Sequence, residues 1–187
     1  MKKYKYLLIV LLFCNSVAFA EPRLRPSDWS APVIGISLDN LYQVDKGVFR
    51  SEQPDTKSFI ELERFGLKEV LNLRKYHSDD DEASKTKLKL HRIKMDAGSI
   101  TEAQITAALK IIKNRKGPIL VHCWHGSDRT GAVIASYRVI FNNWSKEKAI
   151  DEMRNGGFGY HAKIYPNVVT LIKNLNVKKI KSKLGVN

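Results

Sequence analysis

The sequence ILVHCWHGSDRTG, residues 119–131, restricts most strongly what this chain can fold into. Residues 119–122 form a short apolar run that ends in histidine, which predicts a strand in the buried centre of a sheet. The segment after it has apolar residues at helical spacing and predicts a helix that begins near Arg129. A seven-residue loop, 123–129, joins the two and contains Gly126, which permits backbone conformations that bulkier residues resist. A loop of this kind lies at a helix N-terminus, where backbone N–H groups bind anions.

The rest of the chain alternates between short strands and amphipathic helices. We expect strands, the first two as a hairpin, at residues 40–44, 47–51, 67–74, 88–95 and 119–122. We expect helices to start near Asp55, Ser99, Arg129, Ser145 and Asn167, the second of them with a capping box formed by Ser99 and Glu102. Strands interleaved with helices predict an α/β fold, in which a small central, mainly parallel sheet is flanked by helices on both sides.

Residues 1–20, MKKYKYLLIVLLFCNSVAFA, have the pattern of a secretory signal. Three lysines precede an apolar run and the segment ends in Ala-Phe-Ala, so we expect cleavage after Ala20. The apolar run is shorter than the roughly 20 residues that span a bilayer. Cleavage would remove Cys14 and leave Cys123 as the single cysteine of the exported chain, which excludes an internal disulfide.

Composition divides the chain into four segments. The predicted signal is followed by an extended segment, residues 21–39, a globular domain, residues 40–177, and a basic C-terminal tail, residues 178–187. The formal net charge is +13, and removal of the three lysines of the signal leaves 13 − 3 = +10. The basic C-terminus fits a solvated helix face, or else contact with a membrane surface or an acidic partner. Export and the lack of an aromatic-basic pattern argue against nucleic acid, and we expect a monomer.

The loop also carries side chains suited to chemistry at phosphorus. Arg129 offers a planar fork of donors that matches two phosphate oxygens. Cys123 lies at the foot of the same cradle, where N–H groups and the helix dipole favour a nucleophilic thiolate. The Thr130 hydroxyl is placed to donate toward the sulfur. The predicted phosphate-binding loop consists of Trp124, His125, Gly126, Ser127, Asp128 and Arg129, with His122 as a supporting residue.

The motif HCWHGSDRTG resembles the His-Cys-X5-Arg-Thr/Ser-Gly loop of the cysteine-dependent protein tyrosine phosphatases, and the short chain is similar to their dual-specificity branch. The segments GVFRSEQP, VLNLR and NWSKEKAIDEMRNGGFG resemble the TpbA-like periplasmic tyrosine phosphatases of Gram-negative bacteria, so that the resemblance covers residues 40–173. It implies a dual-specificity phosphatase fold and a periplasmic enzyme, with no cofactor or metal, that forms a phosphocysteine. The implied substrate is a phosphorylated protein, periplasmic or membrane-anchored.

The resemblance also implies an aspartic acid that protonates the leaving oxygen and then activates water. Asp96 is the candidate, because it ends a predicted strand and stands 123 − 96 = 27 residues before Cys123, a placement similar to that of the family's acid. Its alternative role is that of a turn or helix-capping aspartate. The acidic run at residues 79–82 offers weaker candidates, because such a run indicates a mobile, solvated loop.

Other residues near the loop have two interpretations. Zinc ligation by His122, Cys123 and His125 is disfavoured, because no second cysteine or histidine pair has the required spacing. Arg50 fits either a brace behind the loop or a surface salt bridge. The segment 154–161 fits either support for the loop or a simple turn.

The variable positions of the loop bear on the substrate. Trp124, His125, Ser127 and Asp128 stand where relatives that act on highly phosphorylated inositides tend to carry lysines, and Asp128 would repel additional phosphates. Trp124 fits stacking on an aromatic substrate. Phosphotyrosine is therefore the first expected substrate, followed by phosphoserine or phosphothreonine where the pocket is shallow. A phosphatase of lipids or small phosphoesters and a phosphate-binding module without turnover are the alternatives.

Overall fold

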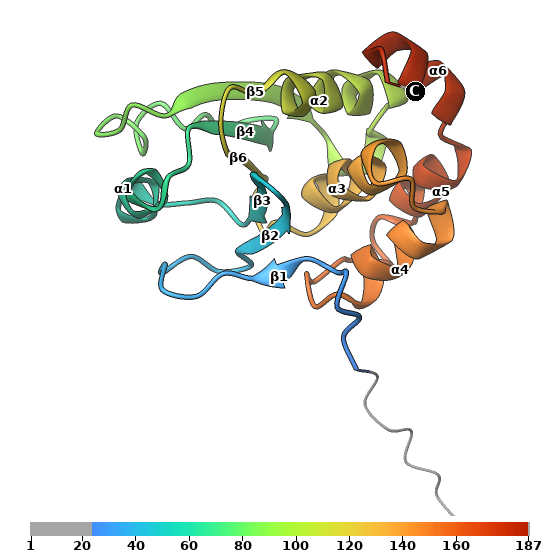
Figure 1. Cartoon of the computed structure of the whole chain (residues 1–187), viewed down its shortest axis with the longest axis horizontal. Helices are drawn as coiled ribbons and strands as arrows, with labels where there is room; N and C mark the ends of the chain where they lie inside the picture. Colours follow the sequence, from blue (N-terminus) through green and yellow to red (C-terminus); the bar gives the residue numbers. More distant parts are fainter. Residues whose placement is uncertain (1–23, 187) are drawn as a thin grey trace, which may run out of the picture.

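A computed structural model describes residues 24–186, and their centre is a six-stranded sheet in the order β1-β2-β3-β6-β4-β5 (Figure 1). The strands are β1 Ala31–Pro32, β2 Tyr42–Asp45, β3 Val48–Ser51, β4 Glu69–Arg74, β5 Lys89–Met95 and β6 Ile119–His122. The first three are antiparallel, whereas β3, β6, β4 and β5 are parallel neighbours. The predicted hairpin and mainly parallel sheet are confirmed. The signal predicted at residues 1–20 lies outside the described residues.

The register of the parallel strands brings three chain segments to one edge of the sheet. His122, the last residue of β6, pairs with Ser51 at the end of β3 and with Asn72 in β4. All four residues of β6 are buried, as expected for a central strand covered on both faces. The loops that leave β3, β4 and β6 therefore meet directly after His122.

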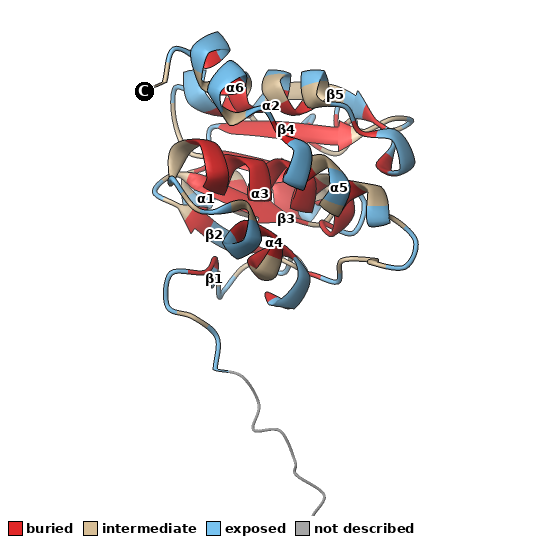
Figure 2. Cartoon of the chain, turned by 90° about the vertical axis from the view of Figure 1, so that its right-hand side faces the viewer, coloured by how far each residue is buried: buried red, intermediate tan, exposed pale blue. Residues whose placement is uncertain are grey.

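Helices cover both faces of the sheet, as predicted (Figure 1). The side chain of Leu120 packs with α1, Thr56–Phe65, whereas Ile119 and Val121 point to the opposite face and pack with the other helices. These are α2 Glu102–Asn114, α3 Asp128–Phe141, α4 Lys146–Asn155, α5 Pro166–Asn174 and α6 Val177–Leu184. Figure 2 shows that α3 is buried along most of its length, because it lies between the sheet and its neighbouring helices.

The helix starts follow the predicted caps except at α2. Asp55 caps α1 and Ser145 caps α4. The capping box predicted for Ser99 is wrong: Thr101 caps α2 and forms the box with Gln104. Ser99 instead ends a short 3₁₀ helix, Ala97–Ser99, because the side chain of Asp96 accepts a hydrogen bond from the Gly98 N–H and starts that turn first.

The segment before β2 is attached to the domain by buried polar contacts. The backbone N–H and hydroxyl of Ser30 donate to Glu152 of α4 over 2.6 and 2.8 Å. The same carboxylate is paired with Arg138 of α3 at 2.9 Å. Residues 24–39, predicted as extended, consist of β1 and turns that pack on the domain through these contacts.

The basic C-terminus predicted as a tail from residue 178 forms α6 instead. Ile180 and Leu184 of this helix are buried in the main core, and Lys113 of α2 donates to the carbonyl oxygens of Leu184 and Gly185. The packed domain therefore continues beyond residue 177. Between residues 24 and 186, no helix is long and apolar enough to cross a membrane.

Replacement of Ile180 by alanine tests this boundary. Because the Ile180 side chain is fully buried, we expect Ile180→Ala to lower the free energy of unfolding by about 2 kcal/mol or more in urea titrations followed by circular dichroism. Lys179→Ala, at an exposed position of the same helix, is the matched control. Equal stabilities of the two variants would show that α6 is not part of the folded core.

Candidate active site

Hydrogen bonds from surrounding residues to its carbonyl oxygens hold the loop between β6 and α3 in place. Four successive carbonyls accept hydrogen bonds from donors outside the loop: Cys123 from His122 Nδ1 at 3.1 Å, Trp124 from Gln53 N at 2.8 Å, His125 from Asn40 Nδ2 at 2.8 Å and Gly126 from Arg50 Nη2 at 2.6 Å. In a planar trans peptide the C=O and the following N–H point in opposite directions. The N–H groups of residues 124–127 are therefore directed toward the inside of the loop, where they form an anion-binding cradle.

Gly126 allows this loop to lie directly on the end of β3. Its φ of +70° is in the left-handed region, which glycine adopts at little cost. A Cβ atom at this position would lie 2.4 Å from the carbonyl oxygen of Ser51. The predicted conformational role of Gly126 is confirmed, and the close approach to Ser51 adds a steric reason for glycine.

The N-terminus of α3 differs from those of α1, α2 and α4. Those three helices have side-chain caps that accept a hydrogen bond from the first turn, whereas Ser127, the N-cap of α3, makes no such bond. The backbone N–H groups at the start of α3 are consequently available to an anion that lies in the loop.

Arg129 projects from the first turn of α3 without an acidic partner. Within residues 24–186, no carboxylate pairs with its guanidinium, and Arg129 Nε is buried without a hydrogen-bond partner. Arg129 lines a pocket of about 220 Å³ together with Trp124, His125 and His161. A cation without a counter-ion beside the inward N–H groups is suited to bind a phosphate group.

Cys123 and Thr130 flank the loop residues that line this pocket, but neither of them lines it. The Cys123 side chain is a free thiol that is 2% exposed. Thr130 is fully buried, and its hydroxyl has no hydrogen-bond partner within the described residues. The predicted donation from Thr130 to the sulfur is therefore not formed in this structure, although Thr130 lies in the helix turn directly after Arg129.

Arg50 braces the loop from below, and its alternative as a surface salt bridge is wrong. Its side chain is 1% exposed, and the guanidinium lies 3.7 Å from the ring centre of Phe158. Burial lowers the pKa of Arg50 to about 10, so that it keeps its charge at neutral pH. The phenylalanine belongs to the segment 154–161, which therefore supports the loop.

Asp128 holds the same segment from the other side. Its carboxylate accepts hydrogen bonds from the backbone N–H of His161 at 3.0 Å and pairs with His161 Nδ1 at 2.9 Å. Asp128 is buried, and the imidazole of His161 lines the pocket beside Arg129. The contact fixes His161 at the rim of the site.

His122 supports the loop as predicted, but its partner was not foreseen. Its Nε2 lies 2.9 Å from Oδ2 of Asp79, and both side chains are buried. The prediction of a mobile, solvated loop at residues 79–82 is wrong for Asp79, which is 3% exposed. Since both ring nitrogens of His122 already have partners, zinc ligation through either nitrogen would break a buried contact. Within residues 24–186, no cluster of three acidic, histidine or cysteine side chains is arranged to hold a metal ion.

Asp96 lies at the rim and has the capping role that was its alternative interpretation, whereas its role as the general acid stays a prediction. Its Oδ1 caps the 3₁₀ helix at Gly98, and Oδ2 lies 3.3 Å from Lys75 Nζ. It also lines a pocket of about 210 Å³ together with Trp124 and Arg129. The hydrogen bond from Gly98, then Lys75 and to a lesser extent the charge of Arg129, hold the pKa of Asp96 below its usual value.

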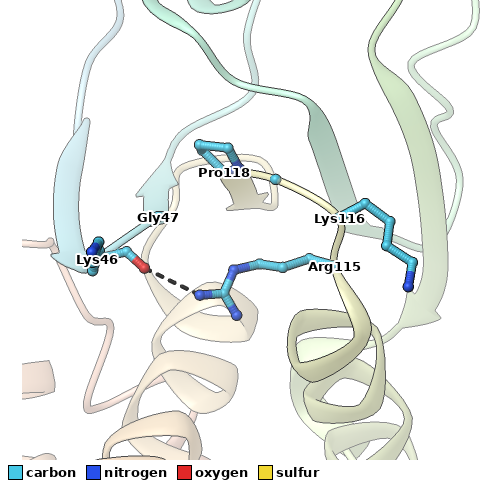
Figure 3. A pocket seen from close by; sticks show the side chains of 6 residues that line it. Lys46, Gly47, Arg115, Lys116 and Pro118 are labelled. Atoms are coloured by element: carbon cyan, nitrogen blue, oxygen red, sulfur yellow. Dashed lines mark hydrogen bonds between the residues drawn. The ribbon is translucent and has the colours of Figure 1, made fainter.

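A larger hollow, of about 550 Å³, lies at the opposite end of the sheet (Figure 3). The guanidinium of Arg115 reaches across it and donates to the carbonyl oxygen of Lys46 in the β2–β3 turn at 3.1 Å, and also to Ile112 at 2.8 Å. Pro118, at its upper margin in the figure, precedes β6, whereas Cys123 follows that strand. Arg115 thus joins two turns, and the residues that line the hollow include no cysteine, serine or threonine.

The geometry agrees with comparisons to known proteins. A sequence model of the tyrosine phosphatase family matches residues 35–184. The chain belongs to this family. It is 34% identical to the dual specificity protein phosphatase TpbA of Pseudomonas aeruginosa over 124 residues, which cover 64% of this chain and 56% of that protein. It is 30% identical to the inositol diphosphatase SIW14 of Saccharomyces cerevisiae over 158 residues, which cover 79% of this chain and 56% of that protein. The matched region spans little more than half the length of these relatives.

Solved structures show the same architecture. The crystal structure of P. aeruginosa TpbA has a TM-score of 0.77 and 27% identity, and the match covers 87% of this chain and 99% of that one. A TpbA structure with a cysteine-to-serine substitution, in complex with phosphotyrosine, gives a TM-score of 0.77 at 26% identity, with 88% of this chain and all of that chain covered. The predicted α/β phosphatase fold is confirmed.

Gly126→Ala tests whether the loop is built as an anion cradle. The added Cβ would collide with the Ser51 carbonyl, so the inward N–H groups must move. We expect the affinity for inorganic phosphate, measured by isothermal titration calorimetry, to fall about tenfold or more, which corresponds to about 1.4 kcal/mol.

Gly35→Ala is the matched control for that measurement. Gly35 also has a positive φ, but a Cβ there would meet no atom within 4 Å. In this variant alanine also has to adopt an unfavourable positive φ, but its Cβ atom collides with nothing. Unchanged phosphate binding by Gly126→Ala would contradict the assignment of the loop.

Proposed function

We propose that this protein is a phosphatase that hydrolyses phosphotyrosine in proteins, with phosphoserine or phosphothreonine as further substrates, through a phosphocysteine intermediate. The observation that carries the proposal is the loop itself. The loop carries inward N–H groups and the unpaired guanidinium of Arg129, and it begins with the free thiol of Cys123. The complex of TpbA with phosphotyrosine supports this choice of substrate.

In the first step, the Cys123 thiolate attacks the phosphorus atom of the bound ester. The S–P bond forms while the bond from phosphorus to the phenolic oxygen breaks, and Asp96 gives its proton to the leaving oxygen. The N–H groups of the loop and Arg129 hold the phosphoryl oxygens, whose charge shifts during transfer. Arg50 contributes its positive charge from beneath the loop.

In the second step, water attacks the phosphocysteine. Asp96, now ionised, takes a proton from that water as the P–O bond forms and the S–P bond breaks. Inorganic phosphate leaves, Cys123 returns to the thiolate, and Asp96 is again protonated. The acid must be protonated when the cycle begins, and a bound phosphate dianion favours this because it offsets the positive charges of Arg129 and Lys75, which otherwise lower the pKa of Asp96.

The rim of the site favours a protein over a small, highly charged ligand. Three large apolar side chains near the pocket are exposed, with Tyr76 at 87%, Ile164 at 66% and Trp124 at 59%. Such exposed apolar groups at the mouth of a polar pocket are typical of contact with another chain. Trp124 stacks on His125 with ring centres 5.1 Å apart, which presents a flat aromatic wall to the substrate.

A second candidate is a phosphatase of inositol phosphates or lipids. Similarity to the inositol diphosphatase SIW14 favours it, as does the pair of cations at the rim, Lys75 beside Asp96 and Arg74 over the Trp124 ring at 5.4 Å. Cleavage of a diphosphoinositol phosphate with a higher kcat/KM than a phosphotyrosine peptide would establish this candidate.

Export to the periplasm is part of the proposal. It is supported by the charge, length and alanine-rich end of residues 1–20. The substrate would then be a periplasmic or membrane-anchored phosphoprotein. A mature N-terminus at Glu21, read by mass spectrometry of the expressed protein, would establish the cleavage.

Cys123→Ser tests the nucleophile. The hydroxyl is a far weaker nucleophile than a thiolate, so we expect hydrolysis of a phosphotyrosine peptide to fall to background in a malachite-green assay of released phosphate. Binding of the peptide should persist, because the N–H groups and Arg129 are unchanged. Residual turnover near the wild-type rate would exclude the phosphocysteine mechanism, and an inactive wild type that binds the peptide would favour a phosphate-binding module.

The leaving group tests Asp96. A general acid matters most when the leaving oxygen is basic, so we expect Asp96→Asn to reduce kcat about 100-fold with phenyl phosphate and much less with p-nitrophenyl phosphate. The wild-type kcat should fall as pH rises through the pKa of Asp96 in the complex, and this alkaline limb should be absent in the variant.

Lys75→Met tests the role of Asp96 in a second way, through a shift of the alkaline limb of the pH profile. Lys75 is one of the groups that lower the pKa of Asp96, so its removal should keep the acid protonated to higher pH and move the alkaline limb upward. Lys85→Met, at an exposed lysine that makes no contact with Asp96, is the control. A limb that stays in place in Lys75→Met would assign the acid to another group.

A further inference from the structure

Asp79 is an acid in the acidic run 79–82 that the chemistry above does not use. Its carboxylate is almost completely buried, and each oxygen has protein partners. Oδ1 accepts hydrogen bonds from Asn72 Nδ2 at 2.8 Å and from Gln53 Nε2 at 2.9 Å. Oδ2 lies 2.9 Å from His122 Nε2. A buried carboxylate with hydrogen-bond partners on both oxygens is held in a fixed position beside the loop.

The orientation of both amides is determined by Arg74. The backbone N–H of Arg74 donates to Asn72 Oδ1 at 2.7 Å, and its guanidinium donates to Gln53 Oε1 at 3.0 Å. Because the two amide oxygens are thereby occupied, it is the two NH₂ groups that face Asp79. Oδ1 of Asp79 accepts both bonds and has no room for a proton, so a proton on this acid would have to lie on Oδ2, between it and His122 Nε2. Imidazole is a much stronger base than a carboxylate, so this shared proton belongs to His122 and Asp79 is ionised. Burial by itself raises the pKa of Asp79, but the bond and charge of His122, then the Gln53 bond, hold it below its usual value.

Both ring nitrogens of His122 then face groups that only accept. Nε2 faces the ionised Asp79, and Nδ1 lies 3.1 Å from the carbonyl oxygen of Cys123. A neutral imidazole has one N–H and one lone pair, so it would set a lone pair against one of these oxygens. Only the doubly protonated ring satisfies both contacts. The ring is fully buried, so water cannot replace either partner.

The surroundings of the pair contain few other charges. On the α1 side, the Phe59 ring centre lies 6.5 Å from that of His122. In the loop of Asp79, His77 is paired with Glu82 at 2.9 Å, and Arg74 follows from β4. Near Cys123 the further charges are the cations Arg50 and Arg129. Asp79 is therefore the anion in direct contact with His122.

We infer that Asp79 is a positioning residue, which keeps His122 doubly protonated and thereby favours the thiolate of Cys123. The pair is neutral in total but polar, since His122 bonds the backbone of Cys123 while Asp79 lies beyond the far nitrogen of the ring. The positive end of this ion pair is thus directed toward Cys123. The charge also strengthens the hydrogen bond that holds the first carbonyl of the loop.

Asp79→Asn removes the charge with almost no change in shape. The new amide oxygen can accept from Asn72 and Gln53, which places its NH₂ opposite His122 Nε2. The ring must then accept there and keeps one proton, on Nδ1, for the Cys123 carbonyl. We expect the pH midpoint for alkylation of Cys123 by iodoacetamide, read by mass spectrometry of the full chain, to rise by about one pH unit.

Asp80→Asn is the matched control, because it removes the same charge from the exposed neighbour in the same loop. Its midpoint should equal that of the wild type. The inference rests on the proposed function only for the role of the thiolate as nucleophile, and alkylation reads the thiolate whether or not an ester is hydrolysed. A folded Asp79→Asn variant whose midpoint equals that of Asp80→Asn would overturn the inference.

A measurement on the unsubstituted protein covers the case in which Asp79→Asn fails to fold. Nitrogen-15 NMR of the histidine rings distinguishes one from two ring protons. We expect one of the described histidines to keep both protons between roughly pH 6 and 9, where an unperturbed histidine loses its charge. The absence of any such ring across this range would equally overturn the inference.

Discussion

The hydrogen bonds to four successive carbonyl oxygens of the loop are the constraint on which the rest of the site depends. They turn residues 123–126 so that the following N–H groups face inward. Their donors come from before β2, from the end of β3, from the segment after β3 and from β6 itself. The parallel register that joins β3 and β6 brings three of these donors to one edge of the sheet, and Asn40 reaches the same edge from the segment before β2. The sheet topology is therefore what makes an anion cradle possible.

Charge is buried around this loop wherever it can be compensated. A buried ion is costly unless other groups satisfy it, and Arg50 meets this condition with a carbonyl and an aromatic face, as Asp79 does with two amides and an imidazole. Arg129 differs from both, because within residues 24–186 its guanidinium has neither a hydrogen-bond acceptor nor an acidic partner, and its Nε is buried. The fold thus gives polar or aromatic partners to the charges that support the loop and leaves free the cation that the proposed function assigns to the phosphate.

Local sequence predicted the parts of the site that are themselves local. The strand, the loop with Gly126 and the start of α3 follow one another directly, so pattern and spacing suffice. The roles of Asp79 and Asn40 were not predicted, because their partners depend on which strands are neighbours and in what register. The acidic run also has the composition of a solvated loop, and only the structure shows that Asp79 faces His122. The same holds for α6, since no local pattern says whether Ile180 has a surface to pack against. The cap of α2 moved because a competing 3₁₀ turn used the residues around Ser99.

The residues that support the loop lie far from it in the sequence, and this affects when the loop forms during folding. Asn40 and Arg50 reach residues 85 and 76 positions later in the chain, so they can hold the loop only after most of the sheet has assembled. Contacts of such long range form late. Until then the donors and cations that surround Cys123 in the folded protein are not in place, and in the proposed mechanism these groups make the thiol reactive. In the proposed mechanism, the contacts that activate Cys123 therefore also delay its activation until the chain has reached its final shape.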